Sequence, residues 1–311
     1  MIAVTGETGR SNRDLTQMAV RKIFGRYQRE ERPSNILTPQ PVAKDQSMEQ
    51  LRKLWVDTQI IDAGTNYDMY ETHLHLAVAN SPKKFSAKEI EYFSLVLVEF
   101  QYEKNFNWKA GCFLNVLVAE SMDTDFVIHT AHLTTLIDGL GKGNVCKSIT
   151  IKGDVGGYTG KGMKGGKIVV DGNTHGYTGI QLSGGEIIVN GGAGEVIGWE
   201  MSGGFIHILG SVTINPGMDM TGGKIIIEGN ADIFVGREMK SGELIILGNV
   251  GHFAGEDMEG GAIRIGKGTG QVIGRNMQGG EIHINDLDMK NISEYVVNGK
   301  IFSKGVLVFE K

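Results

Sequence analysis

From about residue 153 onward, apolar and glycine positions recur along the chain with a fixed period. The pattern G-x-x-M-x-G-G-x-I-x-I-x-G-N has its first glycine every 19 residues, at Gly160, Gly179, Gly198, Gly217, Gly236, Gly255 and Gly274. Four residues follow each glycine pair, and the second and fourth are apolar: Ile168/Val170, Ile187/Val189, Ile206/Ile208, Ile225/Ile227, Leu244/Ile246, Ile263/Ile265 and Ile282/Ile284. Because side chains alternate across a strand, each pair points to one side of a short β-strand.

One such strand cannot bury its apolar side alone, whereas stacked repeats line the pairs into continuous columns. A second apolar column consists of Met163, Leu182, Met201, Met220, Met239, Met258 and Met277. A β-propeller or a leucine-rich solenoid fits less well, because the repeat is too short for a blade and has a different consensus. The period therefore predicts a mainly β protein, a right-handed single-stranded parallel β-helix of seven or eight coils over residues 147–285.

Glycine explains how so short a coil can turn several times. The chain has 46 glycines and five prolines, and the glycines do not recur every third residue as they do in collagen. Glycine reaches positive φ without a steric penalty, so the glycine pairs suit the corners of a coil. Gly-Asn steps such as Gly229-Asn230 suit other corners, because Asn tolerates the left-handed region and stacked amides hydrogen-bond from coil to coil.

The first half of the chain lacks this period. Residues 1–46 mix charge, Ser, Pro and Gln, and we expect a flexible or partner-bound arm with one amphipathic helix over 14–27. Residues 47–146 are expected to form a small α+β capping domain, with helices over 48–59, 86–104 and 108–121 and a strand near 125–130. A capping box at Ser86 and Glu89 marks the start of the second helix. Since a β-helix end exposes strand edges, residues 286–311 should form the opposite cap.

The repeat resembles a known domain family. The run GDVGGYTGKGMKGGKIVVDGN at 153–173, and the ending NGKIFSKGVLVFEK, are similar to the GXGXG repeat domain, and the similarity covers about residues 147–311. That domain forms one of the subunits in formylmethanofuran dehydrogenase and in the related formyltransferase/hydrolase complex, and it is also the C-terminal domain of the large chain of glutamate synthase. The resemblance implies a structural spacer that packs against catalytic domains and carries no catalytic residues of its own.

Charge and cysteine content narrow the classes of partner. The net charge of −5 offers no basic excess for a phosphate backbone, which argues against nucleic acid. There are two cysteines, Cys112 and Cys146, and no apolar run approaches the roughly 20 residues that span a bilayer. We therefore expect a cytoplasmic protein that does not enter a membrane.

An outward column on the predicted strands is unusually apolar. It consists of Val169, Ile188, His207, Ile226, Ile245, Arg264 and His283, and Phe205 lies beside it. A stacked apolar strip needs a cover. The chain's own arm or helices are one candidate, and a subunit interface, with a second copy or a catalytic partner, is the other; a plain β-branched surface is a third interpretation. Trp199 and Met218, on a neighbouring column, are added to the predicted partner interface.

Acidic residues also stack on successive coils, at Glu200, Asp219, Glu238 and Asp257. Like charges about 5 Å apart repel by about 1 kcal/mol even in water, so this acidic ladder needs compensation. Arg237, Arg275 and Lys240 are close enough in the repeat to supply it. A solvated ladder is the plain interpretation, and a site for a cation or a basic partner is the alternative.

The histidines are the metal candidates. His73-x-His75 places two imidazoles on one side of a predicted strand, and His129-x-x-His132 supplies a second pair. No Cys or carboxylate cluster in the sequence completes a set, so we predict no metal and no cofactor. Glycine motifs inside the repeat are products of its period and do not connect a strand to a helix, which argues against dinucleotide binding.

The leading hypothesis is a non-catalytic β-helical scaffold that docks a partner, such as an oxidoreductase or a formyl- or amide-transfer enzyme. The second hypothesis is a hydrolase or transferase whose histidine site lies between the N-terminal domain and the β-helix. The third is a self-assembling structural homo-oligomer.

Overall fold

A computed structural model describes residues 46–58, 67–80 and 83–311. The chain divides into two units, residues 1–42 and 43–311, and every described residue belongs to the second unit. The helix predicted over 14–27, and nearly all of the predicted arm, lie outside the described residues.

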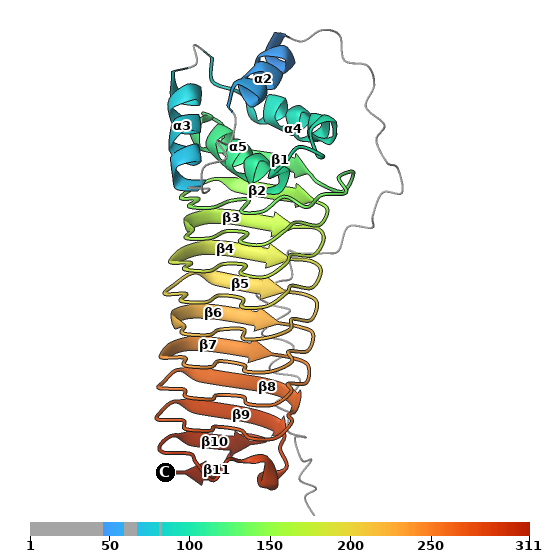
Figure 1. The fold of residues 1–311 in the computed structure, drawn as a ribbon. Helices are drawn as coiled ribbons and strands as arrows, with labels where there is room; N and C mark the ends of the chain where they lie inside the picture. Colours follow the sequence, from blue (N-terminus) through green and yellow to red (C-terminus); the bar gives the residue numbers. More distant parts are fainter. Residues whose placement is uncertain (1–45, 59–66, 81–82) are drawn as a thin grey trace, which may run out of the picture. The chain divides into compact units, whose positions relative to one another are not determined.

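The second unit is dominated by one sheet whose eleven strands follow one another in chain order (Figure 1). The first ten strands run parallel, and the eleventh is antiparallel to the tenth. The strands are β1 (Asp125–His129), β2 (Ser148–Lys152), β3 (Lys164–Val170), β4 (Gly184–Val189), β5 (Phe205–Ile208), β6 (Thr221–Ile227), β7 (Ser241–Ile246), β8 (Ala262–Gly268), β9 (Glu281–Asp286), β10 (Lys300–Ser303) and β11 (Val306–Glu310). This arrangement confirms the predicted parallel β-helix.

The strand register reproduces the 19-residue period. Ile225 lies beside Leu244 and Ile227 beside Ile246, and all four side chains are fully buried. The methionine column is also fully buried from Met163 to Met277. Stacked aliphatic columns therefore fill the inside of every coil, as the alternation of apolar residues predicted.

The coils extend beyond the predicted range of 147–285 at both ends. At the start, β1 pairs in parallel with β2, and Asp125 lies beside Ser148, so the first coil belongs to the solenoid although its spacing is longer. At the end, β10 continues the period, because Lys300 lies beside Glu281 and Ile301 beside Ile282. Strand pairing therefore continues on both sides of the boundaries predicted at 146 and 285, since the glycine pattern fades in the terminal coils before the strand pairing does.

Glycine is required where the backbone approaches the core. At Gly198 φ is +67°, and a Cβ atom there would lie 2.5 Å from Ile225 Cδ1 of the next coil. The equivalent glycines of the other coils have φ between 66° and 72°. The first glycine of the repeat is thus fixed by both the turn and the side chain packed against it.

The asparagines at the corners act differently from the prediction. Asn230 and Asn249 do not have positive φ. Instead, the Asn230 side-chain oxygen accepts a hydrogen bond from the Asn249 backbone N–H, at 2.8 Å, and Asn173 accepts one from the Gly192 N–H at the same distance. Coil-to-coil hydrogen bonds are present, but they join a side chain to the next backbone rather than amide to amide.

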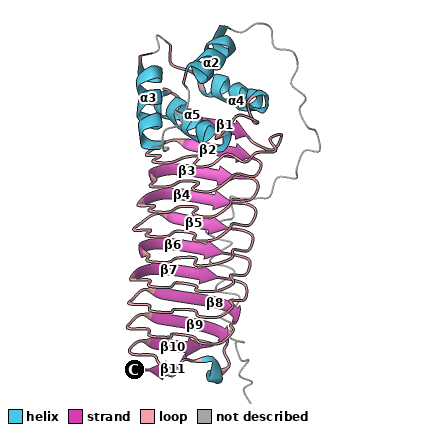
Figure 2. Ribbon diagram, in the orientation of Figure 1, coloured by secondary structure: helices cyan, strands magenta, loops and turns pink. Residues whose placement is uncertain are grey.

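Helices cover the N-terminal end of the solenoid (Figures 1 and 2). They are α2 (Gln46–Asp57), α3 (Tyr67–Ala79), α4 (Ala87–Val96), the 3-10 turn η1 (Leu97–Glu99) and α5 (Phe106–Glu120). In this helical cap α4 packs against β1, and α5 packs against α3 and α4. The predicted capping box is present: Ser86 and Glu89 exchange backbone and side-chain hydrogen bonds. The helix predicted to reach residue 104 ends at Val96, because the chain turns there and Phe100 stacks on Trp55, with 5.1 Å between ring centroids.

The C-terminal end closes with a hairpin. A short 3-10 helix, η2 (Met289–Asn291), precedes β10. Lys304 and Gly305, both with positive φ, turn the chain back into β11, whose pairing with β10 contains an irregularity at Val308. Among the described residues, no helix is long and apolar enough to cross a bilayer.

Candidate interaction surface

The outward column predicted on the strands is assembled as expected. Val169, Ile188, His207, Ile226, Ile245, Arg264 and His283 lie side by side on consecutive strands. The column is not evenly exposed, however. Its middle is buried, with exposed fractions of 3% for Ile188, 4% for His207 and 2% for Ile226, whereas Arg264 is exposed. His207 Nε2 lies 3.0 Å from a carboxylate oxygen of Glu228.

The charges beside this column alternate along the solenoid. Lys167 pairs with Glu186 at 2.9 Å, and three coils further on Lys224 pairs with Glu243 at 2.7 Å. Phe205 occupies the coil between these two ion pairs, at the same strand position. The apolar island, defined as Ile188, Phe205, Leu209, Ile226 and Ile245, thus interrupts a ladder of opposite charges. Ile188 and Ile226 are buried, so its accessible part consists of Leu209 and the half-buried Phe205 and Ile245. Leu209, which is 37% exposed, was missed because it follows the strand motif instead of lying within it.

Trp199 and Met218 do not belong to the strand side. They lie in the turns that precede β5 and β6, and both are half-buried. The Trp199 indole N–H donates to a carboxylate oxygen of Asp219 at 3.3 Å. The predicted interface set therefore falls on two different surfaces of the coil, the strand side and the turn side.

The acidic ladder has a backbone explanation. Glu200, Asp219, Glu238 and Asp257 have φ between 52° and 56°, so this position of every coil is left-handed. Gln181 and Asn276 share the column and the conformation. Asp and Asn are among the residues that enter this region at lowest cost. The polar character of the column therefore follows in part from its turn geometry.

Neighbouring side chains compensate the charge of this ladder. Lys240 lies 3.4 Å from an oxygen of Asp219, and Arg237 lies 3.1 Å from one of Glu238. Gln181 donates to Glu200 at 2.8 Å, and Asn276 donates to Asp257 at 3.1 Å. Arg275 pairs with Glu256 at 3.2 Å, outside the ladder. These contacts match the solvated ladder and provide no separate support for a cation site.

The structure separates the predicted histidine set. His73 and His75 are in α3, not in a strand, so the two residues point about 200° apart around the helix axis. The prediction was wrong because a short apolar stretch fits both periods. His75 lies 3.8 Å from Glu120, and His129, at the end of β1, lies 3.1 Å from Glu91.

His132 is the most perturbed of these histidines. Burial first, and then the nearby His129, lower its pKa from the usual range. Its Nε2 atom is buried without a hydrogen-bond partner. Within the described ranges, no group of three or more His, Cys, Asp or Glu side chains is placed to hold a metal ion.

Comparison of the sequence with protein-family models gives no match, and comparison with curated proteins gives none either. Function therefore has to be inferred from the chain's own repeat and geometry.

Proposed function

We propose that this protein is a β-helical scaffold that docks a partner enzyme on the strand side of its solenoid. The partner class that we favour is an oxidoreductase or a formyl- or amide-transfer enzyme, as the resemblance to the GXGXG repeat domain implies. In this proposal the solenoid positions the partner and takes no part in the chemistry.

The observation that carries the proposal is the apolar island. Around it the strand side consists of alternating charges that neutralise one another, as on an ordinary solvated sheet. Leu209, which is exposed, and Ile245, which is half-buried, leave an apolar surface beside this ladder that a partner can cover. An interface with an apolar centre and a polar rim has this composition.

The filled interior supports the same view. The side chains of the aliphatic and methionine columns are fully buried, and the turn glycines pack directly on core isoleucines. Inside the described coils, no space remains between successive layers for a substrate. The outer surface is therefore where a solenoid of this kind can act.

A partner-retention experiment tests the proposal. The tagged full-length chain is purified from its native source, and partners present in stoichiometric amounts are identified by mass spectrometry. We expect an enzyme of the favoured class, lost when Leu209→Asp places a charge in the apolar island. Val297→Asp is the matched control, since Val297 is 58% exposed and lies near the C-terminal end. Equal loss of the partner in both variants would contradict docking at the island.

Two other results would overturn the scaffold proposal. Near-stoichiometric zinc or iron in the purified protein, lost in His129→Ala, would favour the hydrolase or transferase hypothesis. A large homomer in light scattering, with no second protein, would favour a self-assembling structural protein. The hypothesis that the arm covers the strip involves residues 1–45, which lie outside the described residues.

A further inference from the structure

The turn side of the solenoid carries a column of bulky residues in left-handed conformation. At one position per coil φ lies between 56° and 65°, and the residues are Tyr158, Tyr177, Val196, Asn215, Phe234, Phe253 and Val272. The column contains two stacked pairs. Tyr158 and Tyr177 have ring centroids 4.8 Å apart, and Phe234 and Phe253 have centroids 5.1 Å apart. In each case a valine occupies the next coil, which ends the run of rings.

The first stacked pair is covered at both ends. Trp108 of α5 lies 5.3 Å from Tyr158, between ring centroids. At the other end, Trp199 lies 6.5 Å from Tyr177, with its plane tilted by 52°. Trp199 comes three residues after Val196, so its large indole compensates for the small side chain that ends the stack.

The second stacked pair ends differently. The residue three positions after Val272 is Arg275, not a tryptophan, and its side chain is exposed and paired with Glu256. At the Phe234 end of this pair, the Arg237 guanidinium lies over the Phe234 ring, 5.7 Å from its centre. Among the described residues, the other ring near Phe253 is that of its neighbour His252, 6.3 Å away.

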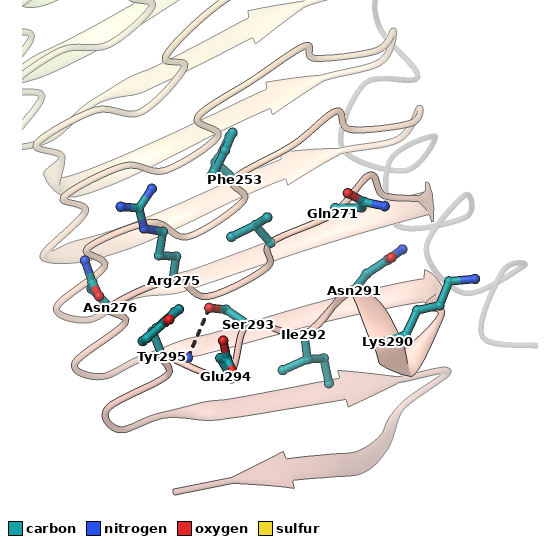
Figure 3. Close-up of a pocket in the computed structure, with 11 residues that line it drawn as sticks. Phe253, Gln271, Arg275, Asn276, Lys290, Asn291, Ile292, Ser293, Glu294 and Tyr295 are labelled. Carbon is teal, nitrogen blue, oxygen red and sulfur yellow. Dashed lines mark hydrogen bonds between the residues drawn. The ribbon is translucent and has the colours of Figure 1, made fainter.

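The ring of Phe253 instead lines an open pocket of about 990 Å³ (Figure 3). Val272 and Arg275 belong to the coil below Phe253, and Ser293 and Tyr295 form the wall contributed by the last coil. The last coil keeps the period, because Ile273 lies beside Ile292 and the Asn276 N–H donates to the Tyr295 carbonyl oxygen at 3.1 Å, and η2 lies at the start of this coil. The volume is in the range of small-molecule sites, about 300–1,000 Å³.

We propose that this pocket binds a small aromatic carboxylate. The ligand's ring would occupy the space above Val272 that an indole occupies above Val196, in contact with Phe253. Its carboxylate would pair with Arg275, whose guanidinium has five N–H donors and lies 3.2 Å from a carboxylate oxygen of Glu256. Offset or tilted ring contacts and a charge-assisted hydrogen bond then act on the same small molecule.

The electrostatics limit the ligand to one acidic group at one end. Glu294 also lines the pocket, at the position of the last coil that corresponds to Arg275, so a second carboxylate pointing toward the last coil would be repelled. Because Arg275 is about half exposed, we expect weak binding that depends on both the ring and the charge. The pocket lies on the turn side and is independent of partner docking on the strand side.

Ligand-observed NMR on the full-length chain tests the site, with benzoate as the probe. Benzyl alcohol keeps the ring and loses the charge, and cyclohexanecarboxylate keeps the charge and loses the aromatic ring. We expect benzoate to bind with a dissociation constant of about 1 mM, and each analogue to bind about tenfold more weakly. Absence of benzoate binding, or equal binding of all three compounds, would overturn the proposal.

Variants locate the binding within the pocket. Arg275→Trp reproduces the arrangement at Trp199, so we expect the folded variant to lose benzoate binding because its own indole fills the space. Arg275→Gln should weaken benzoate about tenfold and abolish its preference over benzyl alcohol. Arg264→Gln, the same change at an exposed arginine on the strand side that pairs with Glu243, is the control that should bind as the unaltered chain does. Unchanged binding in Arg275→Trp, with its fold verified by circular dichroism, would place the probe elsewhere and contradict the proposal.

Discussion

The helical cap and the solenoid bury their apolar residues in opposite ways. In the cap, Trp55 is surrounded by rings from three other segments, and the centroids of Phe93, Phe100, Phe106 and Phe113 all lie within 6.2 Å of it. In the solenoid, each isoleucine packs on the corresponding residue of the coils before and after it. The cap thus has one shared core, whereas the solenoid has many repeated contacts between neighbours.

The cap also holds a buried charge. Lys109, which is 4% exposed, lies over the Trp55 ring at 4.3 Å and pairs with Glu103 at 3.1 Å. Burial lowers the pKa of Lys109, and Glu103 acts in the opposite direction. We therefore expect damage to one residue of the cap to affect all of it, and damage to a coil to stay mostly within the adjacent coils.

The largest effect is expected for Trp55→Ala. Removing the central ring of the cap should lower the free energy of unfolding by about 3–5 kcal/mol. Hydrogen exchange with mass spectrometry should show faster exchange throughout α2, α4 and α5, while the strands from β5 onward keep their protection. Faster exchange along the whole solenoid would mean that the cap and the coils unfold as one unit.

A smaller effect is expected for Gly198→Ala within the solenoid. The added methyl group would meet Ile225 Cδ1 at 2.5 Å, at a residue with φ of +67°, so we expect a loss of about 2–4 kcal/mol in urea unfolding. Gly162→Ala is the matched control, since φ there is +61° but no atom lies within 4 Å of the new Cβ. Its cost should be about 1–2 kcal/mol, from backbone conformation alone. Equal costs for both variants would show that contact with the core isoleucine does not matter.

The smallest effect is a loss of stability in acid, and we expect it in the helical cap but not in the solenoid. Although burial acts to raise the pKa of Glu89, hydrogen bonds from Lys83, Ser47 and Ser86 outweigh it and lower the pKa to about 2. A carboxylate with a lowered pKa stabilises the fold above its ordinary value of 4.5, and this contribution is lost as the pH falls toward 2. Thermal unfolding between these limits should depend less on pH in Glu89→Gln than in the unaltered chain. Glu195→Gln, an exposed change in the solenoid, should keep the original pH dependence.

The solenoid could be predicted from the sequence more closely than the helical cap or the surfaces could. Strand register, the inward pairs and the outward column could be predicted from the period, because each coil repeats the same physical problem. The α3 helix was missed because Leu74, Leu76 and Val78 alternate as they would in a strand, and so short an apolar stretch fits both periods. Ile188 and Ile226 were correctly placed on the outward column, but the period alone does not predict that they are buried.

The candidate binding site was the hardest part to predict. From the sequence, Arg275 was expected only to compensate the acidic ladder, and the pocket beside it is also lined by Lys290 and Asn291 of η2. Because η2 is not part of the repeat consensus, the repeat pattern could not reveal the pocket. The sequence does show Trp199 and Arg275 at equivalent positions of two coils. The period alone, however, does not show that a stacked pair of rings ends beside each of them.

The reversed strand β11 has a consequence for molecules that meet end to end. A stack of equivalent coils can in principle be lengthened by another molecule's first coil, which would give an unlimited filament. Here the final edge runs antiparallel, is irregular at Val308 and carries Lys304 at its turn, so a strand added there would not continue the parallel hydrogen-bond pattern of the coils. Because helices cover the opposite end, neither end of the described solenoid offers the bare parallel edge on which further coils could stack.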